Sequence, residues 1–140
     1  MAIIERIIEV EASAEKLYEV VSDIENYPSF LTWCDSSEIL SIEGHLVTAS
    51  LSINLLGFKS SITTLNRLYR PEKIEMNIRE GPFKSFKGTW FFEVVSLEKT
   101  RVSYTMEYHI SNPITDLLVK KKLDSFIDQF VGEFVKKFKE

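Results

Sequence analysis

The sequence predicts an α+β protein in which helices gather on one side of a single curved antiparallel sheet. Apolar and polar residues alternate with a period of two in several segments joined by short turns, which is typical of hairpin-linked strands. Helical spacing of apolar residues is confined to a short stretch near the N-terminus and a long one at the C-terminus. The 140 residues contain no repeat, linker or low-complexity run, so we expect one domain, residues 1–140.

The N-terminal part of the chain predicts a strand followed by a helix. The strand is expected over residues 3–10, a segment rich in isoleucine. Ser13 is a suitable N-cap for a helix whose apolar residues follow helical spacing. These residues are Leu17, Val20, Val21 and Ile24. Tyr27 and Pro28 interrupt the spacing, so the segment 24–31 is expected to form only a helical turn or a loop.

Six strands are predicted between residue 33 and the C-terminal helix. The expected segments are 36–43, 46–55, 58–69, 73–78, 86–94 and 102–110. Glycines at Gly44, Gly57 and Gly81 mark turns between them. Alternate residues of the last two strands are expected to share the inner face of the sheet. They are Phe86, Gly88, Trp90, Phe92 and Val94, then Val102, Tyr104, Met106, Tyr108 and Ile110.

A long C-terminal helix is predicted to begin at Asn112 and Pro113, which suit the N-cap and first helical positions. Phenylalanines at every fourth position, together with aliphatic residues, form an apolar stripe over about half of the helix surface. The stripe consists of Leu123, Phe126, Ile127, Phe130, Val131, Phe134, Val135 and Phe138. Because Ile114, Leu117 and Leu118 lie off this stripe, we expect a bend or a change of packing partner near Lys120.

Charge and composition exclude several classes of protein. Seventeen Lys and Arg residues against 21 Asp and Glu give a net charge of −4, which disfavours sequence-independent binding to DNA. Cys34 is the only cysteine, and it follows Trp33 without a basic neighbour. It is therefore expected to be a buried, inert thiol in a reducing cytosol. The sequence shows no signal peptide or membrane-spanning run, which favours a cytoplasmic protein.

No pattern typical of catalysis is found. His45 and His109 lack metal-ligand spacing relative to Cys34 or to each other, and no phosphate-binding glycine loop or nucleophile elbow is present. We therefore expect no metal, no required cofactor and no enzymatic activity. The inner face carries the small residues Ala49, Ser60, Thr64 and Gly88 beside large aromatic ones. Two interpretations remain open: these residues leave room for an apolar ligand, or side chains of the C-terminal helix fill that room.

Several stretches resemble the coenzyme Q-binding and ribosome association toxin family of START-like proteins, also described as polyketide cyclase/dehydrase-like. They are YPSFLTWCDSSEIL, LSINLLGFKSSITTLNRL, MNIREGPFKSFKGTWFF and the late FVKK motif. The resemblance implies a helix-grip fold, in which a curved antiparallel sheet wraps a long C-terminal helix around an apolar cavity. It implies a lipid or polyprenyl-quinone ligand and no established catalytic residues. Two departures are Thr32, where the family usually has proline, and Lys136-Lys137, where it usually has arginines.

The expected ligand site is the lining of that cavity. Its candidate residues are Trp33, Leu51, Ile53, Ile62, Thr64, Met76, Ile78, Phe83, Phe86, Gly88, Trp90, Phe92, Tyr104, Met106, Tyr108, Phe126, Phe130 and Phe134. A second expected site, for an anionic membrane surface or another polyanion, consists of Lys120, Lys121, Lys122, Lys136 and Lys137. The leading hypothesis is binding of a polyprenyl quinone or similar isoprenoid lipid in support of respiration, with peripheral contact at the inner membrane. The alternative is a protein that binds a ribosomal subunit and blocks subunit association.

Overall fold

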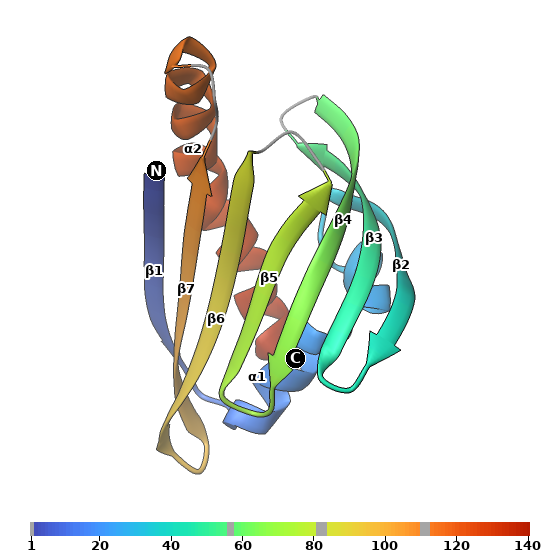
Figure 1. The fold of residues 1–140 in the computed structure, drawn as a ribbon. Coiled ribbons are helices and arrows are strands. Elements are labelled where there is room, and N and C mark those ends of the chain that lie inside the picture. The colour runs from blue at the N-terminus through green and yellow to red at the C-terminus, as the bar shows by residue number, and fades with distance from the viewer. Residues whose placement is uncertain (1, 56–57, 81–83, 110–112) are drawn as a thin grey trace.

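Seven strands form one antiparallel sheet that curves around a long helix (Figure 1). The computed structural model describes residues 2–55, 58–80, 84–109 and 113–140. The strand order in the sheet is β1-β7-β6-β5-β4-β3-β2, so every neighbouring pair except β1 and β7 is consecutive in the chain. The strands are β1 (Ala2–Val10), β2 (Cys34–Glu43), β3 (Leu46–Leu55), β4 (Phe58–Tyr69), β5 (Lys73–Glu80), β6 (Ser85–Ser96) and β7 (Lys99–His109).

The strands β3 and β4 show how the alternating sequence produces the sheet. Their ends match the predicted segments 46–55 and 58–69, and the pair runs in register from Leu46 opposite Arg67. Val47, Ala49, Leu51 and Ile53 of β3 are buried, whereas the intervening residues are only half-buried. This alternation places one face of the sheet in the core and the other toward solvent.

Three helical segments complete the fold: α1 (Ala14–Ser22), the 3-10 helix η1 (Ile24–Ser29) and α2 (Pro113–Phe138). The Ser13 hydroxyl caps α1 by accepting the backbone N–H of Lys16 at 3.2 Å, as predicted. Ile24 belongs to η1 rather than to α1. The helix α2 is uninterrupted through Lys120. The side chains that suggested a bend there, namely those of Ile114, Leu117 and Leu118, lie outside the described part of the structure, as do Gly57, Gly81, Ile110 and Asn112.

The apolar stripe of α2 packs against the concave side of the sheet. All eight of its residues are buried, from Leu123 to Phe138. Trp90 of β6 lies at the centre of this contact, with its ring centroid 6.0 Å from that of Phe130 and 5.0 Å from that of Phe134. Aromatic pairs at such distances add to the free energy gained from burial alone.

Val94 is exposed, although it keeps the alternation that the sequence predicted for this face of the sheet. Its side chain is 63% exposed, whereas Trp90 and Phe92 of the same alternation are buried. Figure 1 shows that the tip of the β6–β7 hairpin extends past α1. The register of the two strands also shifts between Val94 and Ser96. The alternation of apolar and polar residues therefore predicted the side of the sheet on which Val94 lies, but not how exposed its side chain is.

Thr32 joins the loop before β2 to α2. Its hydroxyl donates to Glu133 Oε2 at 2.6 Å, and its backbone N–H donates to Glu133 Oε1 at 3.2 Å. Gln129 Nε2 donates to the same threonine oxygen at 2.9 Å. These bonds place the neighbouring Trp33 against the middle of α2, where its ring lies 5.3 Å from that of Phe130.

Candidate functional site: an apolar cavity between the sheet and the C-terminal helix

A small cavity lies between the concave side of the sheet and α2. Its volume is about 60 Å³. It is lined by Trp33, Leu51, Ile53, Ile62, Met76, Ile78, Phe86, Tyr104, Met106, Leu123, Phe126 and Phe130. The lining contains no charged side chain, because it comes from the inward positions of five strands, the residue before β2 and the apolar stripe of α2.

The cavity brings together most of the residues that the sequence singled out. Leu123 is the lining residue that the expected site missed, and its membership of the apolar stripe was the available signal. Six expected residues are buried beside the cavity without lining it: Thr64, Gly88, Trp90, Phe92, Tyr108 and Phe134. Phe83 lies outside the described residues. The inner face of the sheet thus has two parts: one part borders the cavity, and the other, around Trp90, is packed without a cavity.

The volume of the cavity bears on the two interpretations that the sequence left open. Pockets that enclose organic ligands typically measure about 300 Å³ or more. The rings of Phe126 and Phe130 therefore fill most of the space between sheet and helix, and a larger ligand requires them to move.

Gly88 does not leave an empty space beside Trp90, contrary to the first of those interpretations. A β-carbon at Gly88 would lie 2.5 Å from the hydroxyl oxygen of Tyr104 and 3.1 Å from the carbon that bears it. The tyrosine reaches across from β7, where it is paired with Trp90. The Tyr104 hydroxyl thus occupies the space that a side chain at position 88 would need.

Two side chains that line the cavity carry buried polar atoms without a partner. Among the described residues, neither Trp33 Nε1 nor Tyr104 Oη has a hydrogen-bond partner. Burial raises the pKa of the Tyr104 hydroxyl above its usual range, so this group stays protonated at neutral pH. By contrast, buried Asn66 donates to the Val47 carbonyl at 3.1 Å and to Thr64 Oγ1 at 2.9 Å. The polar side chain of Asn66 is therefore satisfied, whereas the polar atoms at the cavity are not.

The sheet opens between β5 and β6 next to the cavity. The paired residues of these strands end at Asn77 and Lys87, although β5 continues to Glu80 and β6 begins at Ser85. A hollow of about 450 Å³ lies at this opening on the outer side of the sheet. Ile78 and Phe86 line both this hollow and the interior cavity. Asn77, Lys84, Ser85, Lys87 and Glu107 form the rest of the outer hollow.

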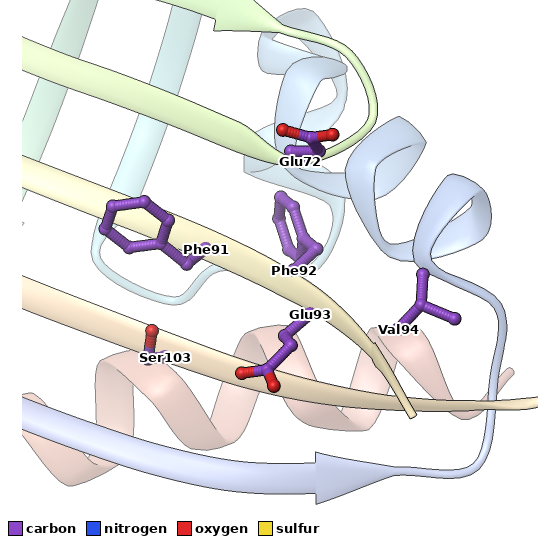
Figure 2. Close-up of a pocket in the computed structure, with 6 residues that line it drawn as sticks. All are labelled: Glu72, Phe91, Phe92, Glu93, Val94 and Ser103. Atoms are coloured by element: carbon purple, nitrogen blue, oxygen red, sulfur yellow. The ribbon is translucent and has the colours of Figure 1, made fainter. Parts of the chain in front are cut away.

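Another surface hollow, of about 650 Å³, lies on the outer side of the sheet near the β6–β7 hairpin (Figure 2). It is lined by Glu72, Phe91, Phe92, Glu93, Val94 and Ser103. Figure 2 shows that the carboxylates of Glu72 and Glu93 point to opposite sides rather than toward a common point. Phe91 and Val94 are largely exposed, so a ligand would remain in contact with water along the sheet. This hollow offers little enclosure and no convergent polar groups.

The remaining predicted features lie outside the cavity. Cys34 is buried, and desolvation together with the neighbouring charge of Asp35 raises the pKa of its thiol to about 11, which agrees with an inert thiol.

Lys120, Lys121, Lys122 and Lys136 are exposed, and Lys137 lies with its Nζ 3.5 Å from Glu140 Oε1. Within the described ranges, no helix is long and apolar enough to cross a membrane, and no three His, Cys, Asp or Glu side chains are grouped as metal ligands.

A curved antiparallel sheet closed over a long helix, with an apolar cavity between them, defines the helix-grip class of START-like proteins. The chain belongs to the family described as "Polyketide cyclase / dehydrase and lipid transport", whose model matches residues 10–135.

Sequence relatives include a ribosome association toxin and a coenzyme Q-binding protein. The chain is 31% identical over 131 residues to the ribosome association toxin RatA of Escherichia coli strain K12, which covers 94% of this chain and 83% of the relative. It is 22% identical to the mitochondrial coenzyme Q-binding protein COQ10 homolog B of Xenopus laevis, over 91% of this chain and 52% of that protein. The family predicted from the sequence motifs is therefore confirmed.

Solved structures confirm the fold and correct one expectation. A protein from Thermus thermophilus superposes with a TM-score of 0.82 at 22% identity, over 99% of this chain and 94% of the other. The Zhui aromatase/cyclase from Streptomyces sp. R1128 superposes with a TM-score of 0.88 at 15% identity, over 98% and 93%. The expectation of no enzymatic activity, which followed from the lack of a catalytic pattern in the sequence, was wrong: proteins of this architecture include the Zhui aromatase/cyclase.

Proposed function

We propose that this chain binds an apolar small molecule with a long hydrocarbon part, of the polyprenyl quinone or isoprenoid lipid class. The observation that carries the proposal is the cavity of wholly uncharged lining that lies between the sheet and the apolar stripe of α2. The family description includes lipid transport, and one relative is named for binding coenzyme Q. Each methylene group that leaves water contributes about 0.8 kcal/mol before the costs of ordering the ligand and opening the cavity.

The opening between β5 and β6 provides the route to the cavity in this proposal. Ile78 and Phe86 are the two side chains that border both the outer hollow and the interior space. Displacing these two side chains would join the outer hollow to the interior cavity. The hydrocarbon part then lies among the aromatic rings, while the outer hollow, with Lys84, Lys87 and Glu107, accommodates polar atoms near solvent.

Exchange of such a ligand requires contact with a bilayer, and the exposed residues Lys120, Lys121 and Lys122 supply positive charge for it. A lysine near an anionic membrane surface contributes about 1 kcal/mol to binding. The peripheral membrane contact is part of the proposal.

The decisive experiment identifies what the protein carries. Protein purified from its own host is analysed by native mass spectrometry, and its organic extract by chromatography and mass spectrometry. An isoprenoid quinone or lipid in equimolar amount is the expected result. A titration of the ligand-free protein with a short-chain benzoquinone then follows tryptophan fluorescence, which is expected to be quenched because Trp33 lines the cavity. Protein that carries no lipid and shows no saturable quenching would contradict the proposal.

Binding to a ribosomal subunit is the second candidate function. It is favoured by relatives at 31% identity that are named ribosome association toxins and span 94% of this chain. The net charge of −4 opposes contact with RNA, but the exposed run of Lys120–Lys122 gives one local positive surface. Co-sedimentation with purified ribosomal subunits in a sucrose gradient tests it. Binding that falls with salt and a shift of joined ribosomes toward free subunits would support this function.

A further inference from the structure

The aromatic centre of the protein holds two polar atoms that packing alone does not explain. The rings of Trp33 and Tyr104 both lie against Phe130 of α2, at centroid distances of 5.3 Å and 4.8 Å. Both residues line the interior cavity. Their polar atoms, Trp33 Nε1 and Tyr104 Oη, are buried and have no partner among the described residues.

Both atoms destabilise the ligand-free protein. A buried donor without a partner loses its hydrogen bonds to water and gains none, and replacement by an apolar group of the same shape is neutral or favourable. Phenylalanine at position 104 would fill the same ring volume without the hydroxyl. The hydroxyl also requires a glycine at position 88, since a β-carbon there would lie 2.5 Å from the oxygen. Two positions of the sheet thus accommodate one hydroxyl that contributes nothing to packing.

The hydrogen-bonding properties of Trp33 Nε1 and Tyr104 Oη limit the kind of ligand atom that can bind both of them. The indole N–H is a donor only, and the phenol, held neutral by burial, is also available as a donor. A partner for both must therefore supply acceptor atoms. No cation lines the cavity to balance a negative charge, so a neutral acceptor fits best.

We propose that Trp33 Nε1 and Tyr104 Oη donate hydrogen bonds to the carbonyl oxygen atoms of the bound ligand. The cavity then selects an apolar molecule that carries a carbonyl group, such as a quinone ring, over a hydrocarbon of the same shape. This assignment rests on the proposed function, because it names the polar chemistry of the same site.

The test compares two probes on the same protein by isothermal calorimetry. One probe is a 1,4-benzoquinone with a ten-carbon alkyl chain, and the other is the benzene with the same chain. The wild-type protein is expected to bind the quinone between about tenfold and about a hundredfold more tightly, which corresponds to two hydrogen bonds of ordinary strength. Tyr104→Phe is expected to remove most of this preference and to leave the affinity for the alkylbenzene unchanged. Trp33→Phe is expected to have the same effect on the preference.

Tyr27 provides a matched control. It is a buried tyrosine whose hydroxyl donates to the Val21 carbonyl and which does not line the cavity. Tyr27→Phe is expected to lower the melting temperature but to keep the preference for the quinone. Tyr104→Phe is expected to leave the melting temperature of the ligand-free protein unchanged or to raise it. The infrared carbonyl band of the bound quinone is expected to lie at lower frequency in wild type than in Tyr104→Phe.

Three outcomes would overturn the assignment. Equal affinity of the wild type for both probes would show that no polar group recognises the ligand, while the proposed function would stand. A preference retained in both Tyr104→Phe and Trp33→Phe would show that other atoms bind the carbonyl group. Absence of binding by either probe would remove the proposed function and the assignment with it.

Discussion

The hydroxyl oxygen of Tyr104 lies 2.5 Å from the position that a β-carbon of Gly88 would take. Gly88→Ala is therefore expected to lower the free energy of unfolding by about 1–3 kcal/mol, as overpacked core positions do. The double variant Gly88→Ala/Tyr104→Phe is expected to recover part of that loss, because the nearest remaining ring carbon lies 3.1 Å away. Denaturant unfolding of the four proteins in the cycle measures the coupling. Additive effects of the two substitutions would contradict the contact.

The route between β5 and β6 is tested by two isoleucines that both line the cavity. Ile78 also borders the outer hollow, whereas Ile62 of β4 does not. Ile78→Ala is expected to speed both association and dissociation of the alkyl benzoquinone several-fold, with little change in affinity. Ile62→Ala enlarges the cavity without widening the route and is expected to alter affinity more than the rate of association. Stopped-flow quenching of tryptophan fluorescence measures both rates. Equal association rates in the two variants would mean that the ligand enters elsewhere.

Cys34 is expected to make stability depend on alkaline pH. Its thiol has a pKa of about 11 in the folded protein against an ordinary value of 9.0, and desolvation is the main cause. The folded state therefore binds this proton more tightly than the unfolded state. The resulting stability is complete below about pH 9 and is lost as the pH rises to about 11, by up to about 2–3 kcal/mol.

Chemical unfolding at pH 7 to 10 measures this dependence, with Cys34→Ala as the control that removes the titrating group. The variant is expected to be less stable at pH 7 but to lose less stability between pH 9 and 10. The buried hydroxyls of Tyr27 and Tyr104, whose pKa values are also raised by burial, contribute at higher pH. Rapid reaction of the native thiol with a labelling reagent at pH 7 would contradict the assignment of an inert cysteine.

The lysine run of α2 is expected to bind anionic surfaces. Lys120→Glu/Lys121→Glu should abolish flotation with phosphatidylglycerol vesicles at low salt, and wild-type flotation should weaken as salt is added. Lys59→Glu/Lys84→Glu makes the same change of charge at two exposed positions outside this helix and serves as the matched control. Equal flotation of both variants would show that this surface does not dock on membranes. Loss of ribosomal co-sedimentation in the first variant alone would assign the surface to the ribosome instead.

Sequence periodicity predicted the fold well because most strands are half-buried and each hairpin fixes the position of the next strand. Alternation in β3 and β4 gave both ends of each strand, and Pro113 begins α2 as expected. Sequence alternation could not predict that Val94 is exposed, because exposure depends on how far the helices extend over the sheet. The volume of the cavity also could not be predicted, because it depends on the side-chain rotamers of residues such as Phe126 and Phe130. The contact of Gly88 with Tyr104 required the register of β6 and β7, which composition does not encode.

The bonds between Thr32 and Glu133 have a consequence for comparing relatives. Proline, which the family resemblance implies at position 32, has neither an N–H nor a hydroxyl, so it could form neither bond with the carboxylate. A chain with proline there has no such reason to keep an acidic residue one helical turn after the position of Gln129. Threonine at 32 and glutamate at 133 should therefore be inherited together.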